Sequence, residues 1–190
     1  MRVYFVGASG VGKSTLARHA AERFGLKLLP SAARQVSAEL GLASAGDVFG
    51  STDAADAFQS EVFRRQLKNE SEAGDRFVSD RAFDHVAYAA EVSLTTWQTA
   101  RSEEWRGYLD SLRLSSAVVF FVRPAPGGAW PSARDGTRDR YLEPAMVHRV
   151  DGVVQYVLES NEVPYIPVLP ATPRDRTRLV EWVLWRLTKG

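Results

Sequence analysis

Short apolar runs alternate with amphipathic segments along most of the chain. The apolar runs predict five strands, at residues 2–6, 26–29, 77–80, 117–122 and 165–169. Strands that alternate with helices typically form a parallel sheet covered by helices on both faces. The pattern therefore predicts the α/β class, with a five-stranded, mostly parallel sheet between two helical layers. Pro167 has no N–H to donate, which predicts an edge position for the last strand.

Apolar spacing and capping residues predict the helices. Leu16, Ala20 and Phe24 recur at helical spacing, and Gly25 is placed to end that helix with a left-handed C-cap. Three further helices are predicted. The first contains Phe58, Val62 and Leu67, and the second spans residues 86–92. The third has Pro144 in its first turn and an apolar face of Met146, Val150, Val153 and Val157.

The last predicted helix carries two of the tryptophans of the chain. Residues 172–175 have the pattern of a capping box, and the apolar face that follows would hold Leu179, Trp182, Val183 and Leu187. We expect most tryptophans to pack in the interior, with Trp130 open to another role because it lies in a polar segment. The tryptophans are Trp97, Trp105, Trp130, Trp182 and Trp185.

A phosphate-binding loop follows the first predicted strand. Residues 7–14 read Gly-Ala-Ser-Gly-Val-Gly-Lys-Ser, the pattern G-x-x-x-x-G-K-[ST], in which glycines let backbone N–H groups curl around a polyphosphate. Lys13 adds a point charge, the helix that starts there directs its N–H groups and dipole at the same anion, and the Ser14 hydroxyl would hold Mg²⁺. A chance glycine-rich turn is the alternative, but it explains neither the strand before the loop nor the helix after it.

The loop and the strand–helix pattern together predict the three-layer P-loop NTPase fold. The predicted cofactors are ATP and Mg²⁺. The predicted nucleotide-binding residues are Gly7, Ala8, Ser9, Gly10, Val11, Gly12, Lys13, Ser14 and Thr15.

Length, charge and cysteine content narrow the classes of function. The chain has 190 residues, which suits one domain over residues 1–190 with an arginine-rich lid at about residues 124–142. The net charge is only +1, so the arginines between Arg123 and Arg149 are interpreted as local phosphate handling rather than as a surface that wraps nucleic acid. There is no cysteine, which excludes disulfides, thiolate metal sites and cysteine nucleophiles.

Membrane insertion and export are not expected. The longest apolar run, residues 117–122, is far too short to cross a bilayer. The phosphate-binding loop starts at residue 7, which leaves no space before it for a cleavable targeting peptide. We therefore expect a soluble, cytoplasmic protein without a membrane partner.

Candidate acceptor-binding residues follow the predicted strands. In parallel sheets ligands gather at the carboxyl ends of the strands, so residues 30–34 and the pair Asp80 and Arg81 should face the phosphate-binding loop across one crevice. Asp80 could hold the metal, take a proton from an acceptor hydroxyl, or only cap the next helix. Arg81 and Arg34 are candidates for contacts to an acceptor phosphate or ring, with an exposed helical arginine as the alternative for Arg34.

Residues 79–88 read Ser-Asp-Arg-Ala-Phe-Asp-His-Val-Ala-Tyr, which resembles the Asp-Arg motif of thymidylate kinases and deoxynucleoside kinases. With the loop, and with Asp-Gly-Thr-Arg at residues 135–138 before a long helix, the layout is similar to small P-loop kinases that include ribosylnicotinamide kinases. The resemblance implies Mg-ATP-dependent phosphoryl transfer in which Lys13, Arg81 and a lid arginine neutralise the migrating group. The lid candidates are Arg134, Arg138 and Arg140.

The resemblance implies a set of site residues. The catalytic candidates are Lys13, Asp80, Arg81 and Arg138. The substrate-binding candidates are Arg34, Phe58, Arg81, Arg134 and Arg138. By analogy residues 41–68 cover the acceptor base, where Phe58 could stack on a nucleobase, although packing in the core is the more frequent role of such a side chain. Ser14 and Asp80 are the candidate metal ligands.

One departure from the family pattern bears on the acceptor. Many relatives that phosphorylate a hydroxyl carry an acidic residue after the second strand, where this chain has Ser31. An acceptor phosphate, with a second pKa of about 6, needs no base at neutral pH. The sequence therefore favours a thymidylate-like deoxynucleoside monophosphate, unless Asp80 serves as the base. The alternatives are a hydroxyl on ribosylnicotinamide or on a modified base in DNA, and a nucleotide-gated ATPase or switch; a homodimer is compatible with the sequence.

Overall fold

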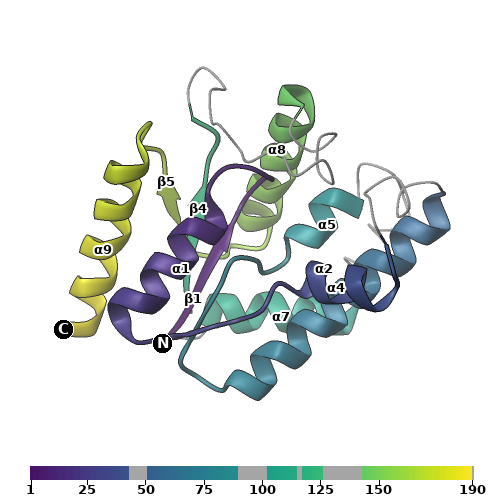
Figure 1. The fold of residues 1–190 in the computed structure, drawn as a ribbon, viewed down its shortest axis with the longest axis horizontal. Helices are drawn as coiled ribbons and strands as arrows, with labels where there is room; N and C mark the ends of the chain where they lie inside the picture. Colours follow the sequence, from purple (N-terminus) through teal and green to yellow (C-terminus); the bar gives the residue numbers. More distant parts are fainter. Residues whose placement is uncertain (43–50, 90–101, 115–116, 126–142, 190) are drawn as a thin grey trace.

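The computed structural model describes residues 1–42, 51–89, 102–114, 117–125 and 143–189, and these residues form an α/β fold around a parallel sheet (Figure 1). The strands are β1 (Arg2–Val6), β2 (Lys27–Leu28), β3 (Phe77–Ser79), β4 (Ala117–Val122) and β5 (Ile166–Val168). Their order is β2-β3-β1-β4-β5, and every pairing is parallel. The predicted fold class is confirmed, and β5 lies at an edge as Pro167 predicted.

The strand β1 is the centre of the core. It pairs with β3 on one side and β4 on the other, so Arg2 lies opposite both Phe77 and Ala117. Residues 3–6 have no exposed surface. A central strand covered on both faces reads as an unbroken apolar run, which is why the sequence identified it.

The described helices are α1 (Lys13–Phe24), α2 (Ala32–Glu39), α4 (Thr52–Ala73), α5 (Asp84–Ala89), α7 (Glu103–Leu114), α8 (Pro144–Ser160) and α9 (Pro173–Lys189). The sequence did not predict α2 or α7. A capping signal for α7 was present, because the Ser102 hydroxyl accepts a hydrogen bond from the Trp105 N–H at 3.1 Å and two glutamates follow Ser102.

The strand order predicts a crevice at the carboxyl ends of β1 and β3. Connections between parallel strands are right-handed. From β1 to β2 the chain crosses the sheet in one direction, and from β2 to β3, β3 to β4 and β4 to β5 it crosses in the other. The helix of the first connection therefore lies on one face of the sheet, and the helices of the later connections lie on the other. Accordingly α1 contacts β1, β3 and α9, whereas α4 and α8 both contact α5. Connections that leave neighbouring strands toward opposite faces open a crevice at their carboxyl ends. The loop after β1 and the residues after β3 lie at this position, and they are joined there by the hydrogen bond between Ser14 and Asp80.

The predicted apolar face of α9 is wrong in part. Its buried side chains are Arg176, Val180, Val183 and Leu184. Trp182 is 59% exposed, Trp185 48% and Leu187 56%, so these three residues do not pack in the core. Val180, Val183 and Leu184 already form a stripe at helical spacing, and the two tryptophans project beside it. Trp105, by contrast, is buried as expected.

Several predicted features lie outside the described residues. They are the predicted lid from residue 126 onward, with Trp130, Arg134, Arg138 and Arg140, and also Trp97. Among the helices of the described ranges, none has the length and apolar character needed to span a bilayer.

Candidate active site

The phosphate-binding loop approaches the sheet too closely for any side chain at its first position. Gly7 has φ of 142°, and a Cβ added there would collide with the carbonyl oxygen of Val122 at the end of β4. Gly10 and Gly12 also have positive φ, at 75° and 96°. The Leu16 N–H donates a hydrogen bond to the Gly12 carbonyl at 3.1 Å, so the N–H groups of residues 13–15, in the first turn of α1, are left for a ligand. This arrangement fits a polyphosphate.

The Lys13 side chain extends back to the start of the phosphate-binding loop. Its ammonium donates hydrogen bonds to the carbonyl oxygens of Gly7 and Ala8, both at 2.6 Å. The same Nζ is 3.8 Å from Oδ2 of Asp84, and the lysine side chain is only 11% exposed. A cation is thus held beside the N–H groups that would bind an anion.

Asp84 supports the phosphate-binding loop, a role that was not predicted from the sequence. Its carboxylate has no exposed surface and accepts hydrogen bonds from the N–H groups of Gly7 and Ala82, each at 3.1 Å. Burial raises the pKa of this carboxyl, while Lys13, Arg81 and the two N–H groups act in the opposite direction. Its place among the apolar residues Ala82, Phe83, Val86 and Ala87 was the available signal, because a buried charge needs partners.

The two residues predicted to bind Mg²⁺ are in direct contact. The Ser14 hydroxyl donates a hydrogen bond to Oδ2 of Asp80, across the crevice between β1 and β3. Ser14 is exposed and Asp80 is partly exposed. Hydroxyl and carboxylate oxygens are the ligands that Mg²⁺ takes, together with water and substrate phosphates. The pair therefore fits a Mg²⁺ ion beside the loop.

Arg81 is held by its backbone and by an aromatic neighbour. Its guanidinium carbon lies 5.7 Å from the centre of the Tyr88 ring. Its carbonyl oxygen accepts hydrogen bonds from the Ser79 hydroxyl at 2.6 Å and from Nε2 of Gln66 at 3.3 Å. The dipeptide of Asp80 and Arg81 is thus fixed from α4 as well as from β3.

Gln66 also connects this dipeptide to a buried carboxylate that the sequence did not identify. Glu70 accepts hydrogen bonds from the Tyr4 hydroxyl at 2.7 Å, the Tyr108 hydroxyl at 2.8 Å and Nε2 of Gln66 at 2.7 Å. Burial raises the pKa of the Glu70 carboxyl, and the three donors oppose that shift. This network links β1, α4 and α7 beneath the crevice.

The remaining acceptor candidates lie on α2 and α4. Arg34 is exposed on α2, the helix that follows β2, and Ser31 is the N-cap residue of that helix. Phe58 is only 8% exposed and packs in a small apolar cluster with Ala32 and Val36. Packing is therefore the role that the structure gives Phe58, and stacking on a base stays a prediction.

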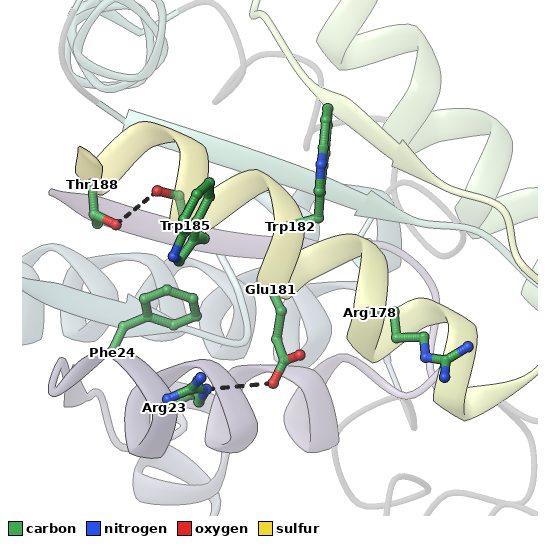
Figure 2. A pocket seen from close by; sticks show the side chains of 7 residues that line it. All are labelled: Arg23, Phe24, Arg178, Glu181, Trp182, Trp185 and Thr188. Carbon is green, nitrogen blue, oxygen red and sulfur yellow. Dashed lines mark hydrogen bonds and ion pairs between the residues drawn. The ribbon is translucent and has the colours of Figure 1, made fainter. Parts of the chain in front are cut away.

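A hollow of about 540 Å³ lies away from this site (Figure 2). It is lined by Arg23, Phe24, Arg178, Glu181, Trp182, Trp185 and Thr188. The first two of these end α1, whereas the phosphate-binding loop precedes it, so the two regions are separated by about 15 Å of helix. Figure 2 shows Arg23 paired with Glu181, a contact of 3.7 Å.

A family model for an AAA domain matches residues 2–176. The match covers most of the chain, and the chain belongs to this family. No curated protein matches the sequence.

Several solved structures share the fold at low sequence identity. The crystal structure of NadR protein in complex with NR has a TM-score of 0.72 and 14% identity, over 96% of this chain and 50% of that chain. Shikimate kinase from Acinetobacter baumannii in complex with shikimate has a TM-score of 0.61 and 15% identity, over 99% and 93% of the two chains. Deoxyadenosine kinase from M. mycoides with bound dATP has a TM-score of 0.61 and 12% identity, over 97% and 98%.

These likenesses confirm the predicted resemblance to small P-loop kinases at the level of the fold. The present chain spans about half the length of the NadR chain. At 12–15% identity these likenesses show the fold, and the small molecule bound in each solved structure is a property of that protein alone.

Proposed function

We propose that this chain is a Mg²⁺- and ATP-dependent kinase that transfers the γ-phosphoryl group of ATP to a small acceptor, with a thymidylate-like deoxynucleoside monophosphate favoured. The contact between the Ser14 hydroxyl and Asp80 is the observation that supports this most strongly. It joins the end of the phosphate-binding loop to the dipeptide after β3, where an acceptor would approach. A loop that served only as a turn would not need this opposing carboxylate.

In this proposal the loop and the start of α1 bind the triphosphate through backbone N–H groups, with Lys13 as the nearby cation. Ser14 and Asp80 would hold Mg²⁺, which supplies charge neutralisation for the phosphate oxygens. Arg81, beside Asp80, would bind the acceptor or the migrating group. Arg134, Arg138 and Arg140 are the candidates for a further cation from the predicted lid.

The proton balance distinguishes the classes of acceptor. Transfer breaks the bond in ATP between the γ-phosphorus and the oxygen that bridges it to the β-phosphorus, which leaves with ADP, and forms a bond between the γ-phosphorus and an acceptor oxygen. A hydroxyl acceptor must lose a proton in this reaction, whereas a phosphate with a second pKa of about 6 is already largely anionic at neutral pH. Ser31 offers no base after β2, and Asp80 is engaged with Ser14. Both observations favour a monophosphate acceptor.

A nucleoside hydroxyl is the second candidate acceptor. The likeness to NadR protein in complex with NR, at a TM-score of 0.72, favours a ribosylnicotinamide-like compound over other hydroxyl acceptors. A modified base in DNA is a further alternative of the same chemical type. In each of these cases Asp80 would have to take the proton.

Release of ADP from Mg-ATP, measured against a panel of acceptors, tests the proposal. The panel contains dTMP, the other deoxynucleoside monophosphates, the free deoxynucleosides, ribosylnicotinamide and DNA. We expect dTMP or a close analogue to raise the rate most, and the rate to rise with pH through about 6 as the acceptor phosphate loses its second proton. A stronger response to a free nucleoside would overturn the monophosphate assignment. ADP release that no acceptor changes would indicate an ATPase or switch instead.

A further inference from the structure

A buried arginine from α9 reaches the phosphate-binding loop. The Arg176 side chain belongs to the first turn of α9 and is 1% exposed. Its guanidinium donates three hydrogen bonds to backbone carbonyl oxygens: Nε to Pro170 at 2.7 Å, Nη1 to Val11 at 2.9 Å and Nη2 to Arg123 at 2.7 Å. These three carbonyls belong to the connection after β5, the phosphate-binding loop and the end of β4.

The bond to Val11 constrains the part of the loop that would bind phosphate. Val11 and Gly12 share one planar trans peptide unit, in which the C=O and the N–H point in opposite directions. Holding the Val11 carbonyl toward Arg176 therefore turns the Gly12 N–H away from Arg176. Gly12 has φ of 96°, a backbone conformation that favours glycine, and the hydrogen bond to Val11 helps to hold this peptide unit in one orientation.

The chemistry of the contact requires a guanidinium. Its planar fork presents several N–H donors in fixed directions, so one side chain can serve three carbonyls on three segments. A lysine at this position is a single point charge and could not reach all three. Burial lowers the pKa of Arg176, an energetic disadvantage that the three carbonyl contacts offset.

Anchoring of α9 alone does not account for the geometry. The start of α9 is already fixed by its capping box, since the Thr172 hydroxyl accepts a hydrogen bond from the Asp175 N–H at 3.2 Å and donates one to the Asp175 carboxylate at 2.6 Å. Two of the three Arg176 bonds instead leave this region, for residues 53 and 165 positions away in the chain. The guanidinium therefore contacts the segments that follow the carboxyl ends of β1 and β4, where the nucleotide would lie.

We infer that Arg176 is a positioning residue for ATP binding: it fixes the Val11–Gly12 peptide unit so that the Gly12 N–H faces the phosphate site. This inference rests on the proposed binding of Mg-ATP by the loop. Arg176 touches neither the nucleotide nor the acceptor in this account, and its effect passes through the backbone of the loop.

Calorimetric titration of Mg-ATP into the wild type, Arg176→Met and Arg176→Lys tests the inference. Arg178→Ala is the matched control, because Arg178 lies two residues further along α9 with a side chain that is 63% exposed. We expect Arg176→Met to weaken Mg-ATP binding at least about tenfold, Arg176→Lys to recover only part of the loss, and Arg178→Ala to bind like the wild type.

Steady-state kinetics separate positioning from general loosening of the fold. A positioning role raises KM for ATP and leaves KM for the acceptor unchanged, and the ATP-induced shift of the Gly12 amide resonance is lost in Arg176→Met. Folded Arg176→Met with wild-type ATP affinity would overturn the inference. If Arg176→Met does not fold, an unchanged ATP affinity in Arg176→Lys has the same meaning. A wild type that fails to bind Mg-ATP would overturn the proposed function instead.

Discussion

The two ends of α1 carry very different surfaces. At its N-terminus the phosphate-binding loop gathers N–H donors, Lys13 and the oxygens of Ser14 and Asp80, with Asp84 buried beneath. At its C-terminus a hollow of about 540 Å³ is lined by Arg23 and Phe24 of α1 and by side chains of α9 that include two exposed tryptophans. A concave surface therefore does not by itself identify the active site in this fold.

The helix dipole explains part of the difference. The N-terminal end of a helix carries partial positive charge and suits an anion, whereas the C-terminal end suits cations. Arg23 lies in the last turn of α1 and pairs with Glu181, which also contacts His19 at 2.9 Å. The charges at the C-terminal end are therefore accounted for by the packing of α1 against α9, while those at the N-terminal end surround the proposed nucleotide site.

Replacing Lys13 should have the largest effect. We expect Lys13→Ala to lower turnover at least about 100-fold, which corresponds to about 3 kcal/mol of lost transition-state stabilisation. Because Lys13 lies 3.8 Å from the buried Asp84, a fall in stability at neutral pH should accompany it. Steady-state rates and chemical denaturation measure the two effects. Lys27→Ala, at an exposed position of β2, is the control, and equal turnover in the two variants would remove Lys13 from the chemistry.

Replacing Asp84 should mainly affect the folded loop. Asp84→Ala leaves the N–H groups of Gly7 and Ala82 without their acceptor, at a cost of about 2–3 kcal/mol in the free energy of unfolding. Asp84→Asn keeps one acceptor oxygen and should cost less. Urea denaturation measures both, with Asp53→Asn in the exposed first turn of α4 as the control. If Asp84→Ala is as stable as the control, the carboxylate does not support the loop.

Glu70 should give the fold a pH dependence that its neutral analogue lacks. Burial raises the pKa of this carboxyl from 4.5, so the folded state holds the proton more tightly than the unfolded state. The stabilisation is complete below pH 4.5 and is lost as the pH rises through the folded-state pKa. We therefore expect the stability of the wild type relative to Glu70→Gln to fall as the pH rises above this value.

Denaturation of both proteins at a series of pH values checks the Glu70 prediction. Glu72→Gln, with a side chain that is 62% exposed on the same helix, is the control and should parallel the wild type. A constant difference between wild type and Glu70→Gln across the pH range would mean that burial does not shift the pKa of Glu70.

The hollow at the other end of α1 should give the smallest effect. Trp182 is 59% exposed, so Trp182→Ala should change the free energy of unfolding by no more than about 0.5 kcal/mol and leave turnover unchanged. Tyr156→Ala, also 59% exposed but on α8, provides a comparison of equal exposure. A large loss of turnover in Trp182→Ala alone would link the hollow to the active site.

Local patterns made much of the fold predictable. The strands β1 and β4 have the predicted bounds, Gly25 ends α1 in a left-handed conformation, and Thr172 caps α9. Each of these features depends on residues close together in the sequence. The short helix α2 and the orientation of α9 were missed because packing against distant elements decides them.

Part of the candidate site was predictable for the same reason. The loop and the dipeptide of Asp80 and Arg81 are contiguous motifs, and the carboxyl-end rule for parallel sheets brought them together. The supporting residues were not predictable, because Asp84 reaches Gly7 across 77 positions and Arg176 reaches Val11 across 165. Such contacts are set by the folded topology, and neither residue belongs to the loop motif that it supports.

Following the γ-phosphoryl group of labelled ATP shows whether this group is transferred to an acceptor. Purified protein is incubated with Mg-ATP and the acceptor panel, and the labelled products are separated. We expect Mg²⁺-dependent labelling of a small acceptor by the wild type and by Trp182→Ala, and almost none by Lys13→Ala. Label that leaves only as inorganic phosphate with every acceptor, or that is transferred equally well by Lys13→Ala, would contradict it.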